Sequence, residues 1–171
     1  MALIKSCRGR KPKIGEKTWL AENATLVGDL VIGNECSVWF NAVIRADVNT
    51  ILIGNEVNIQ DGAIIHCTYE KTTTEIGDRV SIGHKALVHG CTIESDVLIG
   101  MGAIVMDDCY IESGSIVAAG AVLLEGTRVV SGSVFAGVPA RKVKEITPEL
   151  FKGEVQRIAK NYKLYASWMQ D

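Results

Sequence analysis

Residues 93–123 read IESDVLIGMGAIVMDDCYIESGSIVAAGAVL, and an aliphatic residue returns at every sixth position of this stretch. The same spacing covers roughly residues 14–140, with insertions near Asn49–Ile51 and at Glu70–Glu75 and one unit of five residues before Ile93. The residues in register are Ile14, Leu20, Leu26, Ile32, Val38, Ile44, Ile53, Ile59, Ile65, Ile76, Ile82, Val88, Ile93, Ile99, Val105, Ile111, Val117, Leu123, Val129 and Phe135. Small residues follow four positions after many of them, at Cys36, Ala42, Ala63, Ala86, Ala103 and Ala121.

A period of six residues predicts a β-solenoid. Each unit is one short strand and a sharp corner, and it cannot bury its own apolar residue. Three units close a triangular coil, and adjacent coils stack about 4.8 Å apart, so that the repeated aliphatics form interior ladders. A β-sandwich is the alternative, but it gives no reason to keep one register through so many units. We therefore expect an all-β domain, a parallel β-helix of hexapeptide repeats, over residues 1–146.

The chain changes character in residues 147–171. Thr147 can cap a helix and Pro148 suits its first position. Apolar residues then follow at spacings of 4, 3, 4, 3 and 4, at Phe151, Val155, Ile158, Tyr162, Tyr165 and Met169. The spacing predicts a C-terminal α-helix of about 22 residues with one apolar face. That face should pack on the β-helix or on a neighbouring subunit.

The composition limits the classes of function. The chain has 171 residues, of which 47% are hydrophobic and 22% charged, with a net charge of −2. A packed core is expected, and the near-neutral charge argues against nucleic acid as a partner. No apolar run is long enough to span a membrane, and the first residues lack a signal-peptide core. The five Cys form no CxxC pair, as expected of reduced thiols in the cytoplasm.

The repeat places the three histidines of the chain. His66 and His89 each follow an aliphatic residue in register, so they should project from one outer edge on consecutive coils. His84 falls at a turn of the preceding face and cannot easily meet the other two within one prism. In a homotrimer, one edge supplying His66 and His89 could meet the His84 edge of the next subunit. Three imidazoles with an open fourth position are typical of a catalytic zinc site.

Other readings of these residues remain open at this point. The three histidines could be surface residues of no consequence. Arg45 shares the column of His66 and His89, whereas Asp61 shares that of His84 with Gln60 beside it. Arg45 and Asp61 could therefore pair across the trimer interface, or each could simply be solvated. Two cysteines, Cys67 and Cys91, lie near the histidines in the sequence. We expect them to be small packed residues rather than metal ligands.

Four motifs resemble those of the γ-class carbonic anhydrases, which are hexapeptide-repeat proteins. They are VIRAD at Val43–Asp47, NIQD at Asn58–Asp61, the single His66, and HKALVH at His84–His89. The resemblance covers nearly the whole chain and implies a left-handed β-helix that assembles as a homotrimer. It also implies a metal site in which His66 and His89 come from one chain and His84 comes from the next.

The resemblance assigns roles to further residues. Arg45, Asp47 and Asp61 match residues that hold the trimer and its site, and Gln60 and Asn58 match residues that orient hydroxide and substrate. Tyr162 resembles a tyrosine that lines the site in short members. The implied reaction is reversible hydration of CO₂ to bicarbonate by a metal-bound hydroxide, since Zn²⁺ lowers the pKa of its water to about 7. Fe²⁺ or Co²⁺ would accept the same ligands.

The sequence also departs from the family's archaeal prototype, which carries proton-shuttling Glu residues in an acidic loop. Here Val48 follows Asp47, and Tyr69 lies three residues after His66. Two alternatives therefore stand beside CO₂ hydration. One is a hexapeptide acyltransferase or CoA-thioester hydrolase acting on an acyl-CoA, with a single His as general base. The other is a non-catalytic trimeric scaffold.

Overall fold

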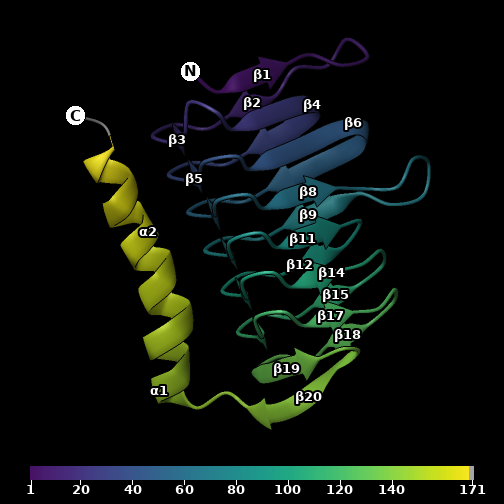
Figure 1. Cartoon of the computed structure of the whole chain (residues 1–171), viewed down its shortest axis with the longest axis vertical. Helices are drawn as coiled ribbons and strands as arrows, with labels where there is room; N and C mark the ends of the chain where they lie inside the picture. The colour runs from purple at the N-terminus through teal and green to yellow at the C-terminus, as the bar shows by residue number, and fades with distance from the viewer. Residues whose placement is uncertain (170–171) are drawn as a thin grey trace.

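The computed structural model describes residues 1–169, which form a parallel β-solenoid of about seven turns and a C-terminal helix. Figure 1 shows the coils stacked along one axis with the helix lying beside them. The fold class predicted from the repeat, a parallel β-solenoid of hexapeptides followed by a helix, is therefore confirmed. The last two residues of the predicted segment 147–171 lie outside the described residues.

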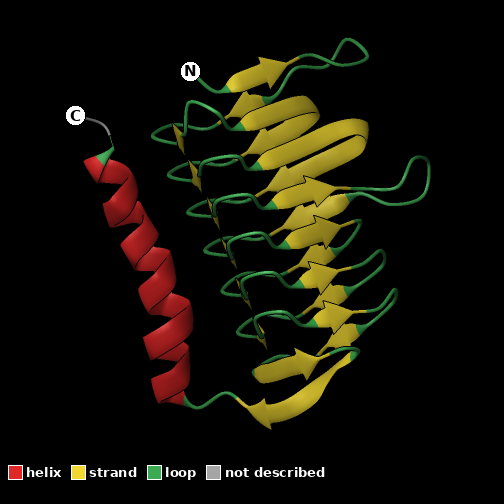
Figure 2. Ribbon diagram, in the orientation of Figure 1, coloured by secondary structure: helices red, strands yellow, loops and turns green. Residues whose placement is uncertain are grey.

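One side of the solenoid is an eight-stranded sheet. Its neighbours run parallel except at the base, where the last two strands pair antiparallel and close the stack (Figure 2). In spatial order the strands are β3 (Trp19–Leu20), β5 (Ser37–Val38), β7 (Asn58–Ile59), β10 (Ser81–Ile82), β13 (Leu98–Ile99), β16 (Ile116–Val117), β19 (Ser133–Gly137) and β20 (Ala140–Glu145).

A twelve-stranded sheet forms the other two sides. One side carries β8 (Ile64–His66), β11 (Leu87–His89), β14 (Ile104–Val105) and β17 (Val122–Leu123). The other carries β9 (Thr74–Ile76), β12 (Thr92–Ile93), β15 (Tyr110–Ile111) and β18 (Arg128–Val129). The strand β6 (Val43–Ile53) joins them, since it pairs with both β8 and β9. On its far side it pairs with β4 (Thr25–Ile32), which in turn pairs with β1 (Leu3–Lys5) and β2 (Lys13–Ile14).

The interior ladders are those that the repeat predicted. From Leu26 to Phe135 every aliphatic or aromatic residue in register is buried, while Ile14 and Leu20 in the first coil are half-buried. The small residues four positions later are buried as well. The insertion near Asn49–Ile51 lies within β6, which runs from one side to the next without the usual corner. The second insertion falls in the connection between β8 and β9 and in the start of β9.

The C-terminal helix begins at Pro148 and runs to Trp168. Thr147 caps it as predicted, because its hydroxyl accepts a hydrogen bond from the backbone N–H of Leu150 at 3.2 Å. Between α1 (Pro148–Leu150) and α2 (Arg157–Trp168) the helix is π-helical over Phe151–Gln156, which the sequence pattern did not predict.

The helix lies along its own solenoid (Figure 1). Val155 packs against Ile116 and Val134 near the base of the stack. Nearer the C-terminus, the ammonium of Lys163 contacts the carboxylates of Glu35 at 2.5 Å and Glu56 at 2.9 Å. The predicted apolar face is only partly right, since Met169 is exposed and the residues buried in α2 are Ala159 and Ala166. No described helix is long and apolar enough to cross a membrane.

A glycine allows β4 and β6 to approach closely. Gly28 has φ +80°, and a Cβ there would lie 2.1 Å from the backbone oxygen of Ala46, the residue before Asp47. By contrast, Gly102 has φ +65° at a corner with open space around it.

We expect Gly28→Ala to lower the free energy of unfolding by about 3 kcal/mol or more. The new alanine would hold a strained positive φ, and the backbone of β4 or β6 would also have to move to admit its Cβ. The matched control Gly102→Ala should cost only about 1 kcal/mol, for the left-handed conformation alone. Urea unfolding of both variants at one protein concentration measures the difference. Equal losses of stability would contradict the proposed close approach.

Candidate active site

Two of the three histidines stack on adjacent coils. His66 ends β8 and His89 ends β11, and the two residues are partners in the parallel pairing of these strands. Their preceding residues, Ile65 and Val88, are fully buried, so the imidazoles project outward. His66 Nδ1 lies 3.1 Å from His89 Nε2, and the ring centroids are 5.1 Å apart.

Each of the three histidines has its own carboxylate. Asp47 Oδ1 lies 3.1 Å from His66 Nε2, and Asp107 Oδ1 lies 2.5 Å from His89 Nδ1. On the other sheet, Asp61 Oδ2 lies 2.9 Å from His84 Nδ1. Because an ionised carboxylate can only accept hydrogen bonds, the ring nitrogen that faces it carries the proton.

The protonation pattern leaves two bare nitrogens facing each other. His66 donates from Nε2 to Asp47 and His89 donates from Nδ1 to Asp107, so the nitrogens 3.1 Å apart are both unprotonated in the neutral rings. Two lone pairs at this distance repel unless a proton or a metal ion lies between them. The arrangement therefore creates a place for a cation on the outer edge of the solenoid.

Asp107 was not among the residues identified from the sequence. Its second oxygen accepts a hydrogen bond from the hydroxyl of Thr68 at 2.6 Å, which fixes the carboxylate beside His89. Gly90 makes room for it, since a Cβ at Gly90 would lie 2.3 Å from Asp107 Oδ1. In the sequence, only the glycine directly after His89 and the presence of an Asp on the next coil point to this contact, and neither shows by itself that the two side chains meet.

The electrostatics favour this pattern of protons. Burial lowers the pKa of His66, although the hydrogen bond to Asp47 opposes the shift. Burial alone would raise the pKa values of Asp47 and Asp107, but their hydrogen bonds lower both below the usual range. The hydrogen bonds to Asp47 come from Arg45 and His66. An imidazole that stays neutral beside an ionised carboxylate is the state that can bind a metal ion.

His84 lies on the eight-stranded sheet, just after β10, among the other candidate residues. Its backbone N–H donates to Gln60 Oε1 at 3.2 Å, and Gln60 Nε2 donates to Asn58 Oδ1 at 2.9 Å. Asn58 donates in turn to the hydroxyl of Ser81 at 2.7 Å. This chain of hydrogen bonds fixes the amide of Gln60 and leaves it one unused N–H.

The helix brings Tyr162 to the same place. Its hydroxyl lies 3.1 Å from His84 Nε2, the nitrogen that does not face Asp61. Trp39 packs edge-on against the Tyr162 ring at 5.2 Å and holds it there. Burial raises the pKa of Tyr162 to about 12, with the nearby Asp61 adding to the shift, so the hydroxyl remains a donor at neutral pH.

The structure keeps the two groups of candidate residues apart within one chain. Among residues 1–169, no three His, Cys, Asp or Glu side chains converge on a point where they could hold a metal ion. Within the chain, Arg45 pairs with Asp47 at 2.5 Å and Asp61 pairs with His84. The pairing of Arg45 with Asp61 across a trimer interface stays a prediction.

The cysteines near the histidines face inward. Cys67 and Cys91 are buried in the interior of the coils, and burial raises the pKa of both thiols. Neutral buried thiols are poor ligands and poor nucleophiles. The expectation that these residues serve packing agrees with their placement.

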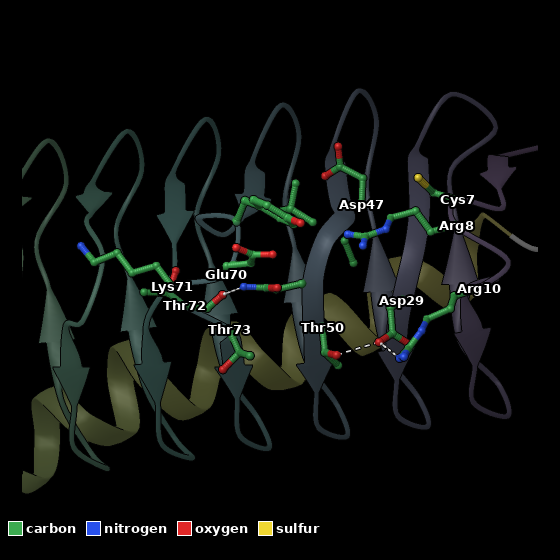
Figure 3. A pocket seen from close by; sticks show the side chains of 14 residues that line it. Cys7, Arg8, Arg10, Asp29, Asp47, Thr50, Glu70, Lys71, Thr72 and Thr73 are labelled. Carbon is green, nitrogen blue, oxygen red and sulfur yellow. Dashed lines mark hydrogen bonds and ion pairs between the residues drawn. The ribbon is translucent and has the colours of Figure 1, made fainter.

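A polar pocket of about 540 Å³ adjoins Asp47 (Figure 3). The turn at Cys7–Arg10 and the loop at Tyr69–Thr73 form its walls, and Val48 and Tyr69 line it beside Asp47. Figure 3 shows the side chains of Arg10, Thr50 and Asp29 joined by hydrogen bonds along one wall. Val48 and Tyr69 thus add no carboxylate to the lining of this pocket.

Comparisons with known proteins agree with the motifs. The family described as "Bacterial transferase hexapeptide (six repeats)" matches residues 11–46 and 90–125. A "Probable carbonic anhydrase" of Methanocaldococcus jannaschii is 52% identical over 151 residues, which are 88% of this chain and 94% of that protein. "Gamma carbonic anhydrase 1, mitochondrial" of Arabidopsis thaliana is 37% identical over 82% of this chain and 53% of its own length.

A solved structure has nearly the same fold. The putative acetyltransferase of Bacillus cereus superposes with a TM-score of 0.95 at 34% identity, over 98% of this chain and 96% of that one. Its description differs from those of the relatives in sequence, although the fold is shared. The repeat, the VIRAD, NIQD and HKALVH motifs and the relatives in sequence show that the chain belongs to the γ-class carbonic anhydrase family of hexapeptide-repeat proteins.

Proposed function

We propose that this protein is a metal-dependent enzyme that interconverts CO₂ and bicarbonate at sites shared between the subunits of a homotrimer. The observation that carries the proposal is the pair of bare nitrogens on His66 and His89, held 3.1 Å apart by two separate carboxylates. The names of the relatives support the same reaction. The proposal includes the cytoplasmic location expected from the unpaired cysteines.

The geometry of the pair suits a tetrahedral metal ion. Zinc binds imidazole nitrogen at about 2.0–2.1 Å, so two of its tetrahedral ligands lie about 3.3 Å apart. The observed 3.1 Å needs a shift of only a few tenths of an ångström. The carboxylates of Asp47 and Asp107 would act as the outer partners that orient metal-binding histidines. His66 and His89 would thus hold Zn²⁺, or Fe²⁺ or Co²⁺, from one chain.

A neighbouring chain would supply His84. An outward column of apolar residues runs directly beside His66 and His89, through Val43, Ile64, Leu87, Ile104 and Val122. Ile64 and Ile104 are 44% and 36% exposed, which leaves an apolar stripe on the surface of the chain. Packing of this stripe against the His84 edge of the next subunit would bury it and would also bring Arg45 toward Asp61.

Different residues of the chain would carry out different parts of the reaction. A bound divalent metal supplies hydroxide near neutral pH by lowering the pKa of its water to about 7. Gln60 has one unused N–H, fixed by Asn58, that can hold an oxygen atom of CO₂ or bicarbonate. Tyr162 can donate its hydroxyl proton in a hydrogen bond at the same place. Asp47 holds the Nε2 proton of His66 and connects the site to the polar pocket.

The alternatives explain fewer of these contacts. An acyltransferase needs one His as a base, and it gives no reason for His66 and His89 to face each other with bare nitrogens. A scaffold gives no reason for a carboxylate on each imidazole. A shared fold with a putative acetyltransferase does not decide the activity.

We expect removal of metal with a chelator to abolish CO₂ hydration, and readdition of Zn²⁺, Fe²⁺ or Co²⁺ to restore it. The interior ladders contain no His, so the circular dichroism spectrum should not change. Stopped-flow hydration assays, run aerobically and anaerobically, measure the activity and identify the metal. Full hydration activity in protein shown to be free of metal would refute the proposal.

We expect Asp107→Asn to weaken metal binding by about 10–100-fold, because His89 loses the carboxylate that fixes its proton on Nδ1. Competition with a chelator measures the affinity. With only three His in the chain, ¹⁵N NMR of the metal-free protein should also show His89 shifting toward the Nε2–H form.

The adjacent and exposed Asp108 provides the control, since it contacts Lys71 but no histidine. Asp108→Asn should bind metal as the wild type does. If Asp107→Asn and Asp108→Asn have the same metal affinity, Asp107 does not position His89.

Mixed trimers test whether the site is shared. His84→Ala and His89→Ala chains should each bind no metal alone, but together they can place an intact His66–His89 edge beside an intact His84. Random assembly of equal amounts should rebuild about one quarter of the sites. Metal analysis of trimers confirmed by mass gives the result. An absence of recovered metal would place all ligands within one chain.

A further inference from the structure

The first residue of β9 is a threonine that is fully buried inside the coil. Thr74 has an exposure of 0%. It continues a column of the twelve-stranded sheet that begins with Leu30 and Ile51, both of them buried aliphatic residues. A hydroxyl group in such a column costs free energy unless it is hydrogen-bonded. The role of Thr74 therefore depends on the partners of its hydroxyl.

Both partners of this hydroxyl belong to the backbone of the histidine pair. Thr74 Oγ1 donates to the carbonyl oxygen of His66 at 2.7 Å. It also accepts the N–H of Gly90, the residue directly after His89, at 3.0 Å. The same N–H lies 3.0 Å from the carbonyl oxygen of His66, to which it also donates. These three groups form a triangle that joins the end of β8 to the end of β11.

The chain needs such a connection here, because it leaves the coil directly after His66. Residues 67–73 form a loop that stands out from the stack, and the chain returns to the stack at Thr74 (Figure 1). After His89, by contrast, only two residues separate β11 from the start of β12 at Thr92. Thr74 thus ties the point at which the loop returns to the point at which it departs.

The coil on the other side of His66 supports it less. The pairing of β8 with β6 ends at Ile65, whereas the pairing of β8 with β11 extends to His66 and His89. The carbonyl group of His66 is held by Gly90 on the next coil and by Thr74. Because this backbone carries the imidazole, the same contacts determine how closely the His66 ring approaches the His89 ring.

We propose that Thr74 is a positioning residue for the metal pair, whose hydroxyl holds the ends of β8 and β11 at the spacing that lets one ion contact both imidazoles. The inference rests on the proposed function in taking His66 and His89 as metal ligands. Thr74 touches neither metal nor substrate and acts through the backbone of the two histidines. Without its hydroxyl, the carbonyl of His66 would keep only the hydrogen bond from Gly90.

Thr74→Val tests the proposal, because valine keeps the shape of the side chain and removes its hydroxyl. We expect the affinity for Zn²⁺, measured by competition with a chelator, to fall about tenfold, as for other residues that orient metal ligands. Thr74→Ser keeps the hydroxyl and should restore the affinity of the wild type. Equal Zn²⁺ affinity in the wild type and Thr74→Val would overturn the proposal.

Ser115 provides the matched control. It is also fully buried, and its hydroxyl also donates to a backbone carbonyl, that of Val130 at 3.1 Å. It lies on the eight-stranded sheet, directly before β16 and away from His66 and His89. Ser115→Ala should lower Tm, as Thr74→Val does, but should bind Zn²⁺ as the wild type does. If both variants lose the same affinity, Thr74 contributes only to the stability of the fold and the proposal is wrong.

Amide hydrogen exchange gives a second readout, which needs no metal. In metal-free Thr74→Val, the N–H of Gly90 should exchange about fivefold faster than in the wild type, which corresponds to one ordinary hydrogen bond. The N–H of Gly100, which donates to the carbonyl of Val117 on another coil, should exchange at the wild-type rate. Unchanged exchange at Gly90 would show that the hydroxyl does not hold this peptide group.

The results also separate this proposal from that of carbonic anhydrase activity. A wild type that binds Zn²⁺ without hydrating CO₂, together with weaker binding by Thr74→Val, would refute the proposed reaction and support the role of Thr74. Zn²⁺ affinity and CO₂ hydration at wild-type levels in Thr74→Val would refute the role of Thr74 alone. A wild type that binds no Zn²⁺ would refute both.

Discussion

The parallel pairing of β8 with β11 is the interaction on which the candidate site depends. It places His66 and His89 in the same column on adjacent coils, so that their ring nitrogens approach to 3.1 Å. The pairing is maintained by the buried ladders on the inside of the coil, where Ile65 lies beside Val88. The packing of the core therefore also determines the geometry of the site, because a change in the register between β8 and β11 would separate the two histidines.

The carboxylates determine the protonation of the histidines that this pairing places together. Asp47, Asp61 and Asp107 come from three different coils, and each determines which nitrogen of one imidazole keeps its proton. His66 and His89 are then left with bare nitrogens that face each other. A solenoid is suited to this arrangement, because its fixed spacing between coils holds both a histidine and its carboxylate in place.

Most of the fold could be predicted from the sequence, because one rule applies to each unit. An aliphatic residue at every sixth position determined the strands, the buried ladders and the outward column of His66 and His89. The place of Tyr162 beside His84 could be suggested only by resemblance, since it depends on how the helix docks. That docking uses the contacts of Lys163 with two corner carboxylates and of Val155 with the base of the stack.

Three features could not be predicted, and each depends on contacts between distant units. Asp107 lies on the coil after His89 and reaches back across Gly90, which no local pattern reveals. Met169 continues the helical spacing but lies beyond the part of the helix that packs on the solenoid. The π-helical turn at Phe151–Gln156 alters the helical period where the helix meets the base.

In the proposed assembly the metal binds between chains rather than within one. Native mass spectrometry during dilution of the metal-loaded protein tests it most directly, because it reports subunit number and bound metal in the same ion. We expect trimers that carry up to three metal ions, and monomers that carry none. Monomers that retain metal at full occupancy would contradict it.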